Sequence, residues 1–420
     1  MSDNSVSSEN DKPSLKRYQA LIAITFGHAA KHLYNGAFRT LLMPEIKFGF
    51  GLNSAQYGIL GTISSTSWWI FTMIGGYFGD RFPHRAGRMI AISLAGMGIG
   101  YFIVGVMPTY ILLIPAFLLI GAGPSFFHPP ALGELSRLFP DKRGFAVSMH
   151  GFGANIGEVI GPLVVGYLLS NLLDWQEILK WSILPALGSA LLILLMVPSR
   201  VRKSSKDNKK FTYFLDLRAA LKNPLLVMLI IALATKSFSD GAVGYFIPVY
   251  LREDPLLLFT PNQVAYLFVI SHILGAIIQP LIGYASDRIG WKIILVGGMS
   301  TIMFSTMLIG LSSVILEFSI VKDIGVSLIH LIVFAILIWG SLHFSLHHTF
   351  IGASLDVSGE ESQSTVVSLV YGAGILALIS PYLFGLIIDS FGYYITFIIA
   401  GIFLFIPTGI LVSLKFPVKR

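Results

Sequence analysis

Long apolar runs recur along almost the whole chain of 420 residues and are separated by short polar breaks. Most runs have the roughly 20 residues that an α-helix needs to cross a bilayer, whereas strands of a membrane barrel would be alternating runs of about ten residues. The pattern predicts an all-α polytopic membrane protein with twelve transmembrane helices. The expected spans are 18–43, 55–79, 89–107, 110–137, 144–169, 178–197, 224–250, 262–285, 292–313, 327–352, 365–388 and 393–414.

The longest polar break, residues 198–223, divides these spans into two sets of six. We therefore predict a cytoplasmic tail at 1–17, an amino-terminal six-helix half at 18–197, a cytoplasmic linker at 198–223 and a carboxy-terminal half at 224–420.

Composition agrees with a membrane protein, because 54% of the residues are apolar and only 12% are charged. A soluble protein carries about 25% charged residues, so soluble, nuclear and disordered classes are excluded. The absence of cysteine excludes disulfides and thiolate metal sites.

The net charge of +7 follows from topology. With both termini and the linker on one side, 22 of the 29 Lys and Arg residues fall on that side, five on the other and two inside spans. The positive-inside rule then predicts cytoplasmic termini in the cell membrane. A nucleic-acid partner is not expected.

Two loops carry the pattern Gly-x-x-x-Asp-Arg-x-x-x-Arg/Lys, one after the second span and one after the eighth. The residues are Gly76, Asp80, Arg81, Arg85, Gly283, Asp287, Arg288 and Lys292. A carboxylate and an arginine at such helix ends can pair across to the next helix and hold one state of a transporter closed. The alternative is that the basic residues only anchor the topology.

Further matches at nearly constant offsets indicate duplicated halves. Lys31 and Lys236 are 205 residues apart, His128 and His347 are 219 apart, and Pro162 lies 219 before Pro381. Parallel repeats of this kind place a substrate site between the halves, near the middle of the bilayer.

With these motifs the chain resembles the transporters of the major facilitator superfamily. More narrowly it resembles the fosmidomycin-resistance efflux family, through Ser125–Pro129, Gly153–Gly157 and His28. Family members usually carry an acid where this chain has His32 and another where it has Pro130.

Part of the fifth span resembles the antiporter motif of the superfamily, which implies proton-coupled export. The matching residues are Gly157, Gly161, Pro162 and Gly166, with Val165 where the motif has a glycine.

Ionisable residues inside the spans are few, and such residues are costly in a bilayer and mark functional sites. The resemblance implies that the first, fourth, seventh and tenth helices line a central cavity, and most of these residues fall on them. The predicted substrate-binding residues are Lys31, His32, Asn35, His128, Lys236, Asp240, His343 and His347.

Lys31 and Lys236 would clamp an anion such as a phosphate, phosphonate or carboxylate from the two halves. The alternative is that each lysine pairs with a protein carboxylate. Asp240 lies one helical turn after Lys236, and Glu158 could serve Lys31.

Proton-coupling candidates are Glu158, Asp240, His28 and His128. Glu158 lies in the middle of its span, and histidine titrates near neutral pH. Structural histidines held between helices are the alternative. His343 and His347 have a spacing that can chelate a metal, but we assign no metal site and no cofactor.

We predict a secondary transporter, not an enzyme, that exports a small organic anion by alternating access in a proton-coupled antiport. No nucleotide-binding loop, nucleophile elbow or zinc-hydrolase motif is present. Because the usual acids are missing in spans one and four, import or exchange of a phosphorylated or carboxylated metabolite is an alternative. Export of a divalent metal is a second alternative.

Overall fold

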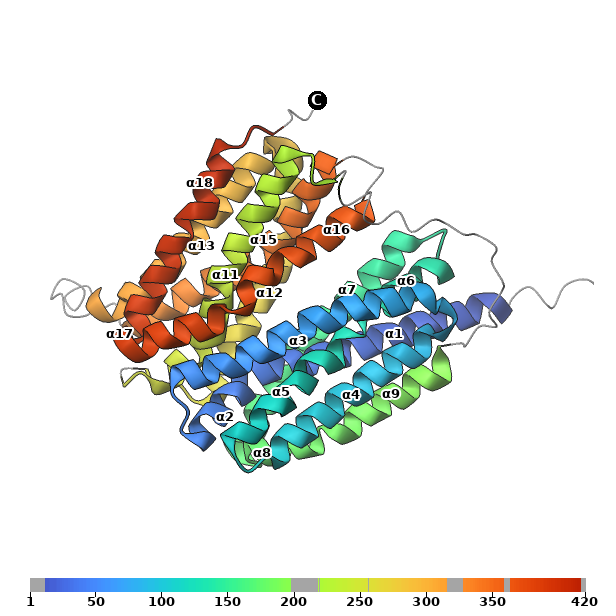
Figure 1. Ribbon diagram of the computed structural model, residues 1–420, viewed down its shortest axis with the longest axis horizontal. Helices are drawn as coiled ribbons and strands as arrows, with labels where there is room; N and C mark the ends of the chain where they lie inside the picture. Colours follow the sequence, from blue (N-terminus) through green and yellow to red (C-terminus); the bar gives the residue numbers. More distant parts are fainter. Residues whose placement is uncertain are drawn as a thin grey trace, which may run out of the picture. The chain divides into compact units, whose positions relative to one another are not determined.

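The computed structural model describes residues 12–197, 218, 220–255, 257–315, 328–358 and 363–416. The secondary structure of these residues is helical, without a strand (Figure 1). The predicted all-α fold class is therefore confirmed. The start of the predicted tail, most of the predicted linker and residues 316–327 lie outside the described residues.

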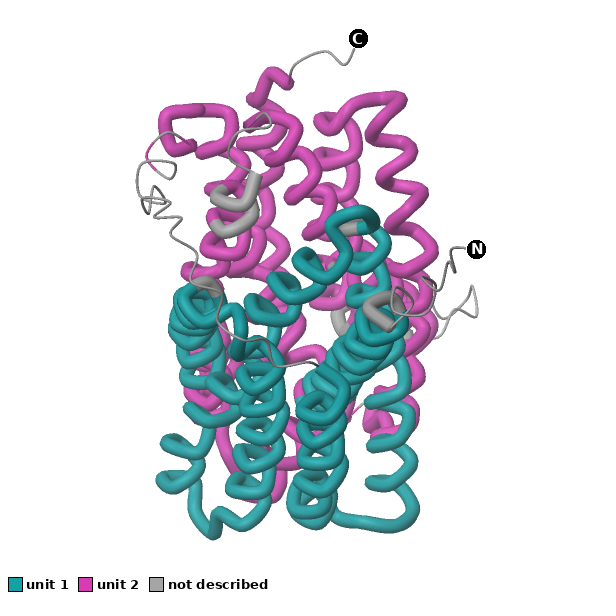
Figure 2. The backbone as a smooth tube through the Cα atoms, turned by 90° about the vertical axis from the view of Figure 1, so that its right-hand side faces the viewer, with its two compact units in different colours: residues 1–38, 63–204 teal, residues 39–62, 205–420 magenta. Residues whose placement is uncertain are grey.

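Contacts between Cα atoms divide the chain into two compact units (Figure 2). The first unit contains residues 1–38 and 63–204, and the second contains residues 39–62 and 205–420. The cut between 204 and 205 falls inside the predicted linker. Segment 39–62, which the apolar pattern assigns to the first half, clusters with the second unit instead.

In the first unit, α1 packs along α7, and α4 packs against α5, α8 and α9. The helices of this unit are α1 (Lys12–Ala37), most of α3 (Ser54–Arg81), η2 (Pro83–Arg85), α4 (Ala86–Val106), α5 (Tyr110–Ser125), α6 (His128–Leu138), α7 (Arg143–Asn171), α8 (Trp175–Trp181) and α9 (Ile183–Met196).

In the second unit, α15 packs against α12 and α13, and α11 packs against η4, α17 and α18. The elements of this unit are η1 (Phe38–Leu42), α2 (Met43–Phe50), the start of α3, α11 (Pro224–Glu253), α12 (Pro261–Ile289), α13 (Trp291–Ile315), α15 (Leu328–Ser358), α16 (Gln363–Gly372), η4 (Ala373–Leu378), α17 (Ser380–Phe403) and α18 (Phe405–Ser413).

Capping residues fix several helix ends. The Asn223 side chain accepts from backbone N–H groups of the first turn of α11, and Pro224 is the first helical residue. Thr260 and Gln263 form a capping box at the start of α12. Gly290, with a φ of 86°, ends α12 and allows α13 to begin at once.

Several predicted spans are divided between elements in the structure, and two interruptions have a clear local cause. The predicted span 110–137 is divided into α5 and α6, and the second of these begins with His128 followed by two prolines. Proline lacks the N–H of the helical ladder and disfavours a helical residue before it, so the break falls here. Gly392, with a φ of 81°, interrupts α17 between the last two predicted spans.

Nine segments of the described chain are long and apolar enough to cross a membrane. They include the predicted spans three to twelve, with the last two contained in Leu369–Ser413. The first two predicted spans lie on α1 and α3, outside these nine. Large apolar side chains such as Ile111 and Leu195 are 74% and 76% exposed, as expected for helices that face lipid. The protein is an integral, multi-pass membrane protein.

Candidate functional site

A row of glycines brings α7 unusually close to α1. Gly153, Gly157 and Gly161 recur every fourth residue on α7, and a Cβ at each would collide with a backbone carbonyl oxygen of α1. The carbonyls belong to Thr25, Ala29 and Leu33, which also recur every fourth residue. Small residues permit such close helix packing in membranes. His28, Lys31 and His32 of α1 and Glu158 of α7, which the sequence assigned to substrate or proton chemistry, lie on these two helices.

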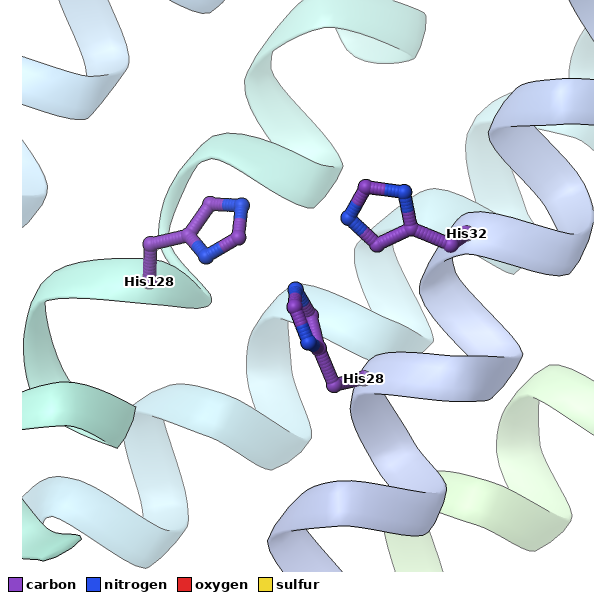
Figure 3. A group of neighbouring side chains, drawn as sticks. All are labelled: His28, His32 and His128. Atoms are coloured by element: carbon purple, nitrogen blue, oxygen red, sulfur yellow. The ribbon is translucent and has the colours of Figure 1, made fainter. Parts of the chain in front are cut away.

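Three polar side chains of α1 share one helix face, because His28, Lys31 and His32 are three and four residues apart. His128 joins them from the first residue of α6, and His150 and Glu158 come from α7. We call these six residues the first cluster. Figure 3 shows the rings of His28, His32 and His128 directed toward one another.

Hydrogen bonds tie the first cluster together across helices. His32 Nδ1 lies 2.7 Å from Glu158 Oε1, and Lys31 Nζ lies 2.5 Å from His128 Nε2. His28 Nδ1 lies 2.6 Å from the backbone oxygen of His150, so it must be the donor of that bond. The rings of His28 and His150 are stacked with their centroids 3.6 Å apart.

Lys31 is almost fully buried, with 2% of its surface exposed. Among the described residues, no carboxylate oxygen lies within 4.0 Å of its ammonium, and its hydrogen-bond partner is the neutral acceptor nitrogen of His128. Glu158, the acid that the sequence offered to Lys31, is bonded to His32 instead. Glu158 acts on Lys31 through its charge but does not contact it. A buried ammonium without a contacting counterion is unfavourable, so the first cluster favours a negative ligand in contact with Lys31.

The second unit holds a different arrangement around its own lysine. Lys236 and Asp240 form a buried ion pair on α11, one helical turn apart. His343 on α15 places Nδ1 3.3 Å from Asp240 Oδ2, and its ring stacks on Trp339. We call Lys236, Asp240 and His343 the second cluster. In this structure Asp240 neutralises Lys236, which is the alternative that the sequence raised for this lysine.

The other predicted substrate residues are less closely tied to these clusters. Asn35 is half-buried on α1, one turn beyond Lys31. His347 is half-buried on α15, and its ring centroid lies 5.7 Å from that of Tyr371. The contacts of His347 therefore differ from those of His128, its counterpart in the repeat.

Within the antiporter-like motif, Gly157 and Gly161 form the seam with α1. Pro162 and Gly166 are buried on the same helix. The packing accounts for the two glycines without reference to transport, and a coupling role for the motif stays a prediction.

The two predicted gating motifs lie at helix ends. Arg81 and Arg85 flank the ring of Phe82, while the side chain of Asp80 lies outside the described residues. In the second motif Lys292 donates to the backbone oxygen of Leu414 at 2.9 Å, beyond the end of α18. A gating role for either motif stays a prediction.

The remaining residues of these motifs are two glycines, Arg288 and Asp287. Gly76 and Gly283 face open space, and Arg288 lies over the ring of Tyr284 at 4.5 Å. Asp287 lies in the last turn of α12.

A charged network in the second unit was missed by the sequence analysis. Glu45 of α2 forms an ion pair with Arg252 at the end of α11, and Lys47 pairs with Glu253. The Tyr393 hydroxyl donates to the second carboxylate oxygen of Glu253 at 2.5 Å. The sequence held a signal for these pairs. Glu45 and Lys47 each have a residue of opposite charge 207 or 206 positions later, close to the offset of the repeat.

Asp389 of α17 also binds residues 39–62, at the start of α3. Its two carboxylate oxygens accept from the backbone N–H groups of Ser54 and Ala55, both at 2.8 Å. These N–H groups open α3, where a carboxylate is favoured by the exposed donors and the helix dipole. Residues 39–62 are thereby joined to α11 and α17 of the second unit.

Residues 25–375 match the model of the family described as the Major Facilitator Superfamily. Among curated proteins, the chain is similar to protein spinster homolog 1 of Xenopus laevis, with 25% identity over 232 residues, 52% of this chain and 43% of that one. It is also similar to the sphingosine-1-phosphate transporter SPNS2 of Xenopus tropicalis, with 26% identity over 215 residues, 50% of this chain and 41% of that one. The matched region thus spans less than half the length of these two relatives.

The similarity to the fosmidomycin resistance protein of Escherichia coli K12 is longer, with 22% identity over 296 residues, 67% of this chain and 69% of that one. Among solved structures, a bacterial homolog of the human lysosomal transporter Spinster, in an inward-facing and occupied conformation, has a TM-score of 0.75 at 15% identity and covers 97% of both chains. The nucleoside transporter NupG has a TM-score of 0.73 at 13% identity, over 94% of this chain and 98% of that one. These structures share the fold.

Proposed function

The chain belongs to the Major Facilitator Superfamily, and from this premise we propose that it transports a small organic anion by alternating access, with the anion bound at Lys31. Membrane transport follows from the family, and the anionic substrate follows from the first cluster. A substrate carboxylate, phosphate or phosphonate would supply a negative group in direct contact with Lys31, which Glu158 does not provide.

The contrast between the two lysines carries this proposal. Lys236 is paired with Asp240, whereas Lys31 is equally buried and contacts an imidazole. Ionisable residues inside a membrane are functional sites by default, but one with a protein counterion is already compensated. The anion is therefore assigned to Lys31, and Lys236 serves to hold Asp240 beside His343. The relative whose name specifies sphingosine-1-phosphate supports a phosphorylated substrate.

We propose proton-coupled export as the mode of transport. Glu158 lies next to the anion site through its bond to His32, and both side chains are 20% exposed, so each can exchange protons. Proton-coupled export requires that the proton and the anion bind in turn, so that proton uptake by this pair from outside follows release of the anion. The similarity to a fosmidomycin resistance protein supports the export direction.

Import or exchange of a phosphorylated or carboxylated metabolite is the second candidate. It is favoured by His32 and Pro130, which replace the two acids typical of the efflux family that the chain resembles. Cytoplasmic termini, as the distribution of basic residues predicts, are common to both candidates.

Flux into proteoliposomes under an imposed pH gradient tests the proposal. The panel consists of phosphonates, organic phosphates, dicarboxylates and divalent metals. We expect at least one anion to be transported, and Lys31→Met to lower its rate at least about tenfold, since a hydrogen bond to a charged group contributes about 1.5–3 kcal/mol. Lys31→Arg is the matched variant that keeps the charge and part of the activity.

Accumulation driven by the pH gradient, measured in the same assay, tests proton coupling separately. Glu158→Gln should retain exchange of the anion across the membrane but lose accumulation driven by the pH gradient. Normal gradient-driven accumulation in this variant would exclude Glu158 as the proton site, and metal flux without any anion flux would overturn the choice of substrate class.

A further inference from the structure

Three histidines of the first unit converge on one small volume. One ring nitrogen from each of His28, His32 and His128 lies within 4.8 Å of the others (Figure 3). We propose that these residues bind a divalent transition-metal ion that prefers imidazole ligands, with Zn²⁺ as the representative ion. The metal site shares its three histidines with the first cluster, next to Lys31, but the inference does not rest on the proposed anion transport.

The spacing suits a metal after a small adjustment. Zinc–nitrogen bonds of about 2.0–2.1 Å in a tetrahedral site place the ligand nitrogens roughly 3.3 Å apart. The widest pair therefore has to close by roughly 1.5 Å at most, which rotation of the rings can supply. Three protein ligands would leave the fourth position of a tetrahedral ion open to water or another donor.

The partners of two rings already match those of metal-bound histidines. A ligating histidine usually donates its other ring N–H to a carboxylate or a backbone carbonyl. His28 does so to the backbone oxygen of His150, and His32 does so to Glu158. Both bonds use Nδ1, so in the neutral tautomer the lone pair of each ring is on Nε2.

The Nε2 atom of His28 is the strongest single indication of a ligand. It is buried and has no hydrogen-bond partner among the described atoms. The stacked ring of His150 holds the His28 ring in place at a centroid distance of 3.6 Å. A buried nitrogen with a lone pair and no donor is unfavourable, and a metal ion would satisfy it.

Lys31 occupies the third ligand in this structure. Its ammonium donates to His128 Nε2, so a metal bound through that nitrogen must displace Lys31. The site therefore holds one cation at a time, either the ammonium or the metal, because two adjacent positive charges in a buried site repel each other strongly. Removal of the Lys31 charge is predicted to strengthen metal binding.

The second unit lacks this set of residues and provides a control. Lys236 and His347 are the repeat counterparts of Lys31 and His128, but the positions that correspond to His28 and His32 are Leu233 and Ser237. His347→Gln thus removes a histidine of equivalent position that has no role in the proposed metal site.

Zn²⁺ binding to the purified full chain, measured by titration calorimetry in detergent without any organic substrate, tests the proposal. We expect one Zn²⁺ per chain, at least about tenfold weaker binding in His28→Gln and His128→Gln, tighter binding in Lys31→Met and unchanged binding in His347→Gln. Mg²⁺, which prefers oxygen ligands, should not bind.

Loss of the fold would disperse the three rings, so tighter binding of one Zn²⁺ per chain in a Lys31→Met protein with wild-type melting behaviour keeps the test valid if a histidine variant is unstable. The proposal is overturned if Lys31→Met binds Zn²⁺ no more tightly than the wild type, or if His347→Gln, but neither first-unit variant, loses binding. Because no anion is present, failure of the anion assay would leave this result intact.

Discussion

Two lysines at equivalent positions of the duplicated halves have opposite surroundings. Each is 2% exposed, yet Lys236 forms an ion pair with Asp240 while Lys31 donates to His128. The Lys236–Asp240 pair could be foreseen from sequence, because residues four apart on a helix are neighbours. The Lys31–His128 bond could not be foreseen, since these residues are 97 positions apart and meet only through helix packing.

Stability should separate the two lysines. Lys236→Met leaves Asp240 as a buried charge without its cation, and we expect a loss of about 3–5 kcal/mol. Adding Asp240→Asn removes that charge and should restore most of the loss. Thermal melting in detergent measures both effects.

Lys31→Met is the comparison for this pair of variants. It removes a buried cation that has no carboxylate within 4.0 Å among the described residues, so it should not lower the melting temperature. A melting temperature of Lys236→Met equal to that of the wild type would contradict the role given to the ion pair.

At the scale of helices, the apolar runs predict the long helices, and two of the departures from them have local causes. The division of α5 from α6 follows from the prolines after His128, and the interruption of α17 follows from Gly392. Gly157 and Gly161 of the row on α7 also belong to the predicted antiporter-like motif. The contact of this row with α1 was not predicted, because pairing between helices is not encoded in the period of one helix.

Gly157→Ala tests this contact. The added Cβ would meet the backbone oxygen of Ala29, so α1 must move away from α7. We expect a loss of about 1–3 kcal/mol, as for an overpacked interior, together with loss of transport. Melting temperature and flux measure the two effects.

Gly151→Ala is the matched control on the same helix. A Cβ at Gly151 meets nothing within 4 Å, and alanine is the better helix former. Its stability should equal or exceed that of the wild type, and equal effects of the two substitutions would argue against the close seam.

The charged network around residues 39–62 predicts a coupling between Glu45 and Arg252. Arg252→Glu places two carboxylates side by side, and we expect it to lower transport through repulsion of α2 from α11. The double variant Glu45→Arg with Arg252→Glu restores opposite charges and should recover flux. Additive effects of the two reversals in a double-mutant cycle would contradict a direct pairing.

At the scale of the whole molecule, the sequence predicted the membrane class and the family, because these depend on composition and on motifs. The two compact units were less predictable. Residues 39–62 precede the linker by more than a hundred positions yet cluster with the second unit, through ion pairs at Glu45 and Lys47 and the contact of Asp389 with the start of α3. Such long-range pairs depend on the tertiary fold.

The central claim is that the anion binds at Lys31 rather than at Lys236, and equilibrium exchange of the transported anion in proteoliposomes, without an ion gradient, tests it most directly. The assay compares Lys31→Met with the double variant Lys236→Met and Asp240→Asn, which removes the other lysine while keeping its cluster neutral. We predict that exchange falls to the level of empty liposomes in Lys31→Met and stays close to the wild-type rate in the double variant. Exchange that survives in Lys31→Met and is lost in the double variant would contradict the account.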